Sequence, residues 1–108
     1  MQDTLDRLWA VLESRKAAAP EGSYVAKLYA RGPDYIAQKV GEEAVETAIE
    51  ALRAARGEAG ARQAFFEESA DLLFHLLALL ARLDAAPADV LSVLERRLDA
   101  GGHKGEVP

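Results

Sequence analysis

Apolar and polar positions recur along this chain with the period of an α-helix, and the pattern predicts five helices. Asp3, Ser23 and Asp34 precede apolar stripes and are expected to act as N-caps, and Pro87 suits a first helical position. No segment alternates with the period of two that marks a strand. We therefore predict an all-α fold. The expected helices lie at about 4–18, 24–30, 35–56, 61–83 and 87–99.

The two longest of these helices are separated by a short turn that contains Gly57 and Gly60, so they should form an antiparallel hairpin. Large apolar residues cover about 220° of the fourth helix, which is more than a surface helix of a small bundle requires. We expect a helical bundle of about five helices around this hairpin, with a core completed by a second chain. The residues expected to form the buried arc of the third helix are Ile36, Val40, Ala44, Val45, Ala48, Ile49 and Leu52.

Length and composition narrow the class of protein. The 108 residues suit one domain, which we expect to span 1–100, with a loose tail at 101–108. The absence of cysteine excludes disulfides and thiolate chemistry. No signal peptide is evident, and the longest apolar run, Leu72–Ala81, is too short to span a bilayer. The net charge of −5 argues against a nucleic-acid surface. We expect a cytoplasmic protein bound to neither membrane nor nucleic acid.

Two pairs of acidic residues suggest the chemistry. Glu43 and Glu46 are three residues apart in the third helix, and Glu68 and Asp71 have the same spacing in the fourth. This spacing places both carboxylates of a pair on one face of the helix. If the hairpin turns the two faces toward each other, the four carboxylates repel one another unless cations lie between them. Mg²⁺ prefers oxygen ligands of this kind, and Mn²⁺ is a possible substitute.

The plainer interpretation is that these acids are solvated surface. It is strong for the third helix, whose polar arc is rich in charges that pair along the helix. It is weaker for the fourth helix, where Glu68, Asp71 and His75 occupy a wedge of about 60° on an otherwise apolar cylinder. Buried acids require cations, so this wedge favours a metal site.

A di-iron or di-manganese bundle is a less suitable alternative. Such sites use a Glu-x-x-His motif, whereas His75 follows Asp71 by four residues and has no second histidine nearby. His75 is more often a structural residue than a ligand at such a position. It could instead orient Asp71 or Glu68 from behind the metal.

Lys27, Arg31 and Lys39 form a basic set ahead of the acids. They are either ordinary surface charge or cations that bind the phosphates of a small nucleotide beside the metal. The sequence lacks a glycine-rich loop ending in Gly-Lys-Ser/Thr, which excludes a P-loop nucleotide hydrolase.

Three stretches together carry a resemblance to a known family. They are Ser23-Tyr24-x-x-Lys27-Leu28, then Ile36-Ala37-Gln38-Lys39-Val40-Gly41-Glu42-Glu43-Ala44-x-Glu46 after Gly32, and Glu68-x-Ala70-Asp71-Leu72-Leu73-Phe74-His75. In this order they resemble the phosphoribosyl-ATP pyrophosphatase family, over about residues 5 to 97. That family is part of the all-α nucleoside-triphosphate pyrophosphatase superfamily, which includes MazG-like proteins.

The resemblance implies Mg²⁺-dependent hydrolysis of phosphoribosyl-ATP to phosphoribosyl-AMP and pyrophosphate, the second step of histidine biosynthesis, by a homodimer. It makes the four paired acids the metal ligands and Glu42 a supporting ligand or the base toward water. Two features depart from the family: Tyr35 stands where a basic residue is expected, and the tail from Gly101 differs.

Two alternatives stay open from the sequence. One is a house-cleaning nucleotide pyrophosphatase of the same fold, acting on dUTP, dCTP or a modified nucleotide. The other is a helical dimerisation module whose acids are only solvated surface.

Overall fold

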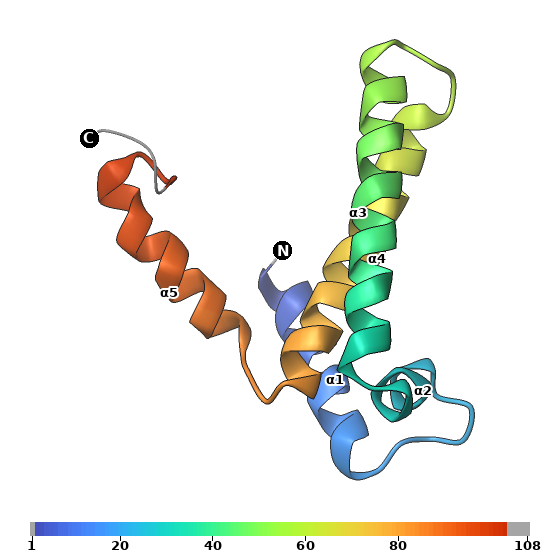
Figure 1. Ribbon diagram of the computed structural model, residues 1–108, viewed down its shortest axis with the longest axis vertical. Coiled ribbons are helices and arrows are strands. Elements are labelled where there is room, and N and C mark those ends of the chain that lie inside the picture. Colours follow the sequence, from blue (N-terminus) through green and yellow to red (C-terminus); the bar gives the residue numbers. More distant parts are fainter. Residues whose placement is uncertain (1, 104–108) are drawn as a thin grey trace.

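The protein, seen in a computed structural model, is all-α over the residues that the structure describes, 2–103 (Figure 1). The all-α prediction is confirmed, and each helix lies within a few residues of its expected range. The segment predicted to be a loose tail lies mostly outside the described residues. The elements are α1 Gln2–Ala17, α2 Tyr24–Arg31, α3 Pro33–Ala55, α4 Ala61–Arg82, α5 Pro87–Arg97 and a 3₁₀ turn, Leu98–Ala100.

The join between α2 and α3 differs from the sequence prediction. Ser23 caps α2 as expected, because its hydroxyl accepts a hydrogen bond from the backbone N–H of Ala26 at 3.2 Å. Asp34, however, lies inside the first turn of α3 and is not its cap. Gly32 alone separates the two helices, with φ 92° and ψ 173°, a conformation that is almost exclusive to glycine. Pro33 then begins α3, where its fixed φ suits a first helical residue.

The core lies at the base of the molecule, where α1, α2, the start of α3 and the end of α4 meet (Figure 1). Leu12, Leu28 and Ile36 are each 0–1% exposed and come from three different helices. Ala78 and Ala81 of α4 are fully buried against them and allow the helices to approach closely. Burial of each large side chain contributes about 1.5–3 kcal/mol, so this cluster holds the four helices together.

Helices α3 and α4 form the predicted antiparallel hairpin, whose far half stands clear of the other helices (Figure 1). The predicted buried arc of α3 is wrong over its second half. Val45, Ile49 and Leu52 are 61%, 45% and 57% exposed, whereas Glu43 is only 7% exposed. Glu43 therefore turns inward along this stretch, whereas the apolar face of α3 turns outward and Glu42 and Glu46 stay exposed.

A single copy of the chain is extended for its length. Its radius of gyration is 16.1 Å, compared with about 13 Å for a compact domain of this size. Helix α5 projects away from the hairpin, and none of its residues, all within the described range, is buried (Figure 1). No helix among the described residues is long and apolar enough to cross a membrane.

Candidate active site

The two acid pairs approach each other between α3 and α4, as the sequence predicted. Burial raises the pKa of Glu43, and the charges of Asp71 and Glu46 raise it further, against the opposing effects of His75 and Lys39. The pKa of Glu68 is also raised, first by a hydrogen bond with Glu46 and then by burial and by the neighbouring carboxylates. Each effect requires proximity, so the structure brings all four acids into one cluster.

Two oxygens of this cluster have no hydrogen-bond donor. Oε1 of Glu43 and Oε2 of Glu68 are both buried, and no donor among the described residues satisfies either atom. For the buried Oε1 of Glu43, the loss of water without a hydrogen-bond donor in its place costs about 1–3 kcal/mol. A bound cation would supply the missing interaction. The donor set is composed of carboxylates, which suits Mg²⁺ or Mn²⁺.

The acids are not in a finished coordination geometry. Within residues 2–103, no three His, Cys, Asp or Glu side chains are arranged to hold a metal ion as they stand. Carboxylates repel one another when no cation lies between them, so a divalent ion would have to draw these side chains together.

His75 lies directly behind the acids, 5% exposed. Its Nδ1 donates a hydrogen bond to the backbone carbonyl of Asp71 at 2.9 Å, one turn earlier in α4. The same nitrogen lies 2.5 Å from Oε1 of Glu43, although the angles do not make this contact a hydrogen bond. The sequence analysis expected His75 to orient Asp71 or Glu68, whereas its contacts here are with the backbone carbonyl of Asp71 and the carboxylate of Glu43.

Tyr24 contacts His75 beside the acids, although the sequence analysis assigned it no role in the site. Its hydroxyl lies 2.7 Å from Nε2 of His75. Its ring stacks on Phe74 and meets the imidazole edge-on, with centroids 6.0 Å and 5.7 Å away. Burial raises the pKa of the Tyr24 phenol, so it stays neutral and can donate. The two residues are 51 positions apart, so no local spacing could reveal the pair.

Glu42 lies outside the cluster that its neighbour Glu43 joins. It is exposed, and its carboxylate pairs with Lys39 at 3.6 Å and accepts a hydrogen bond from Gln38 at 3.3 Å, both on its own helix. Lys39 in turn lies near Glu43. Burial lowers the pKa of the Lys39 ammonium, but the negative charges of Glu42 and Glu43 raise it, and the net change is an increase. Glu42 is therefore connected to the acid cluster through its ion pair with Lys39.

The remaining basic residues, Lys27 and Arg31, lie on α2. The guanidinium of Arg31 lies over the ring of Tyr35, 4.0 Å from its centroid, a cation–π contact that orients the arginine. Tyr35 thus holds a cation beside the start of α3. Lys27 is exposed and shares the helix face of Tyr24 and Arg31, because residues three and seven positions apart lie on one side.

Comparison with known proteins gives one consistent family. A family model described as phosphoribosyl-ATP pyrophosphohydrolase matches residues 5–98. The chain is 48% identical over 98 residues to the phosphoribosyl-ATP pyrophosphatase of Cereibacter sphaeroides, covering 91% of this chain and 89% of that protein. It is 52% identical over 98 residues to the protein of the same name from Azospirillum brasilense, covering 91% and 83%. Over 102 residues it is 50% identical to that of Rhizorhabdus wittichii, covering 94% and 91%.

Proposed function

This chain belongs to the phosphoribosyl-ATP pyrophosphohydrolase family, and we propose that it hydrolyses phosphoribosyl-ATP in histidine biosynthesis. Water is added across the anhydride bond between the α- and β-phosphates, giving phosphoribosyl-AMP and pyrophosphate. Residues 1–100 would act as a single catalytic domain. The observation that carries the proposal is the buried carboxylate of Glu43 beside three further acids, with two buried oxygens that lack donors, in a chain of this family.

The proposed metal ligands are Glu43, Glu46, Glu68 and Asp71, which would hold Mg²⁺, with Mn²⁺ as a substitute. When bound, the ion would stabilise charge on phosphate oxygens and favour deprotonation of water. The proposal keeps Glu42 as a supporting ligand or as the base toward that water. Its exposed position and its pairing with Lys39 suit the role of a base, because a base must reach solvent-derived water.

Phosphate binding is assigned to three cations, of which Lys39 lies beside the acids on α3 and Lys27 and Arg31 lie on α2. Lys39 is adjacent to the cluster on α3, and Arg31 is held over Tyr35 near the start of the same helix. Lys27 lies on the same face of α2 as Arg31. Positive charge on this side would complement the phosphates that the metal does not neutralise.

A substrate panel tests the reaction. Purified protein would be given phosphoribosyl-ATP, ATP, dUTP and dCTP in turn, with Mg²⁺ or with EDTA, and pyrophosphate release would be measured. We expect turnover of phosphoribosyl-ATP that requires Mg²⁺ and is lost in Glu43→Gln and Asp71→Asn. Glu50→Gln, on the same face of α3 but paired with Arg53, is the matched control. Preference for dUTP or dCTP would instead indicate a house-cleaning enzyme.

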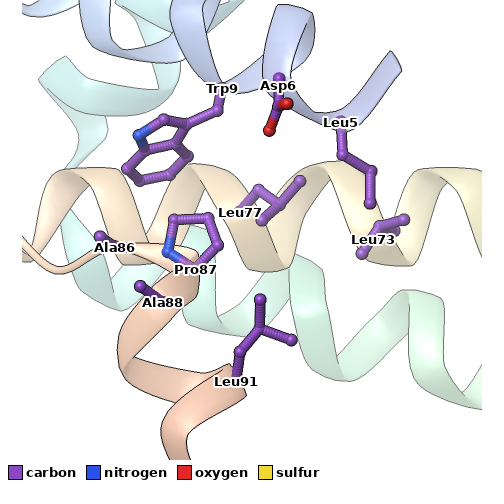
Figure 2. Close-up of a pocket in the computed structure, with 9 residues that line it drawn as sticks. All are labelled: Leu5, Asp6, Trp9, Leu73, Leu77, Ala86, Pro87, Ala88 and Leu91. Atoms are coloured by element: carbon purple, nitrogen blue, oxygen red, sulfur yellow. The ribbon is translucent and has the colours of Figure 1, made fainter. Parts of the chain in front are cut away.

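A homodimer is part of the proposal, because one copy leaves a large apolar surface uncovered. The outward arc of α3, a stripe on α4 and one face of α5 are all exposed. A cavity of about 380 Å³ between α1, α4 and α5 adds to this surface, and Figure 2 shows Leu5 and Trp9 facing Leu73 and Leu77 across it. Apolar patches of this extent mark association sites. The exposed members are Val45, Ile49, Leu52, Phe66, Leu73, Leu76, Val90, Leu91, Leu94 and Leu98.

Light scattering after size-exclusion chromatography would measure the mass in solution. We expect twice the chain mass for the wild type and the chain mass for Ile49→Glu, which places a charge in the outward arc. Ala18→Glu, which adds the same charge in an exposed turn, should stay dimeric. A monomeric wild type would refute the dimer. The proposal also includes a cytoplasmic location, as expected for a biosynthetic enzyme with a nucleotide substrate, and cell fractionation tests it.

A further inference from the structure

A chain of polar contacts joins three helices behind the acid cluster. It begins at the Tyr24 hydroxyl on α2, passes through the imidazole of His75 on α4, and reaches the Glu43 carboxylate on α3. His75 and Glu43 are 5% and 7% exposed and are the two buried polar or charged side chains in the described core. Both imidazole nitrogens are engaged, so the ring cannot rotate without losing a contact.

The partners of the ring determine where its proton lies. The backbone carbonyl of Asp71 can only accept, so Nδ1 carries the hydrogen in that contact. With the proton on Nδ1, Nε2 presents a lone pair, and the Tyr24 hydroxyl satisfies it by donating at 2.7 Å. The opposite tautomer would aim the lone pair of Nδ1 at two oxygens, the carbonyl of Asp71 and Oε1 of Glu43, and both contacts would become repulsive.

We propose that Tyr24 is a positioning residue of the acid site: its hydroxyl fixes the tautomer and orientation of His75, and His75 thereby holds Glu43 in place to bind a divalent cation. This inference rests on the proposed metal site. The Tyr24 hydroxyl contacts no acid in the described contacts and acts only through His75. Residues that orient a ligand in this way commonly change metal affinity by 10–100-fold when they are lost.

If Tyr24 had only a packing role, removal of its hydroxyl would leave His75 and the acids unchanged. Its ring packs on Phe74 and His75, and that packing persists when only the hydroxyl is removed. The chain offers a matched control in Tyr29, a part-buried tyrosine on the same helix. Its hydroxyl also makes one 2.7 Å hydrogen bond, to the backbone carbonyl of Leu12 in the core. Tyr24→Phe and Tyr29→Phe thus remove the same atom and one bond of the same length.

The experiment compares the two variants with the wild type by two measurements. Nitrogen-15 NMR of the metal-free protein reports which nitrogen of His75 carries the proton, and electron paramagnetic resonance measures the dissociation constant for Mn²⁺. We expect the wild type and Tyr29→Phe to show the proton on Nδ1 and to bind Mn²⁺ equally. We expect Tyr24→Phe to populate the Nε2-protonated form and to bind Mn²⁺ about tenfold or more weakly.

The outcomes separate this inference from the proposals on which it rests. Equal tautomer populations and equal Mn²⁺ affinity in both variants would overturn the inference while leaving the metal site intact. A wild-type imidazole protonated on both nitrogens would also overturn it, because Tyr24 would then be an acceptor. A wild type that fails to bind Mn²⁺ would refute the metal site itself. The substrate panel tests the hydrolytic activity independently of all three outcomes.

Discussion

Replacing Glu43 by Gln should have opposite effects on stability with and without a divalent cation. Without the cation, wild-type Glu43 is 7% exposed, lacks a donor at Oε1 and lies among other acids. Removing that charge should raise the free energy of unfolding by about 1–3 kcal/mol, the usual penalty of an unsatisfied buried polar group. At a Mg²⁺ concentration of about one hundred times its dissociation constant, the wild type should gain about 2.7 kcal/mol, which the variant cannot gain.

Urea denaturation followed by far-ultraviolet circular dichroism, at fixed protein concentration in EDTA or saturating Mg²⁺, would measure both effects. In thermal scans the Mg²⁺ effect corresponds to a Tm rise of about 10–20 °C for a domain of this size. Glu50→Gln should follow the wild type in both buffers, because its partner Arg53 is exposed. The reasoning fails if Glu43→Gln is less stable than the wild type in EDTA, or if Mg²⁺ stabilises the two proteins equally.

Three further results are expected. Glu42→Gln should retain Mg²⁺ stabilisation but lose turnover, measured by kcat, because its carboxylate lies outside the cluster; loss of Mg²⁺ stabilisation would make it a ligand. Ile36→Ala should lower the free energy of unfolding by about 2–5 kcal/mol in urea titrations, because Ile36 is fully buried, and a loss below 1 kcal/mol would place the core elsewhere. Tyr35→Leu, which removes the ring beneath Arg31, should raise KM for phosphoribosyl-ATP and leave Mn²⁺ affinity unchanged; an unchanged KM would remove Arg31 from phosphate binding.

Much of the fold could be predicted because local chemistry and hydrophobic period agree in most segments. Ser23 caps α2 through a hydrogen bond three residues away, and Pro87 begins α5, both of which can be anticipated from neighbouring residues. The cap of α3 could not, because Asp34 has a suitable side chain but the helix is capped two residues earlier, at Gly32. Local sequence preference indicates which residues can cap a helix, and the path of the backbone determines which of them does.

The spacing of the acidic residues predicted which carboxylates share a face of a helix. Helical periodicity shows which residues share a face but not which face packs against α4, and hydrophobicity alone predicted the face of α3 that a single copy leaves exposed beyond Val40. The inward position of Glu43 contradicts that simple rule, and such contradictions are expected at functional sites. Tyr24 was missed because its contact with His75 depends on how α2 packs, which no sequence period encodes.

Gly32, the single residue between α2 and α3, connects the two halves of the site. Gly32 carries the whole change of direction in a conformation that is almost exclusive to glycine, yet a side chain there would meet nothing within 4 Å. Any resistance to substitution is therefore torsional and not steric. Helix α2 carries Tyr24, Lys27 and Arg31, and Gly32 connects it to the α3–α4 hairpin that carries the acids. A change in the backbone conformation of Gly32 would displace these three side chains together while the acids stayed in place. The conformation of this one residue therefore governs how the two halves of the site are aligned.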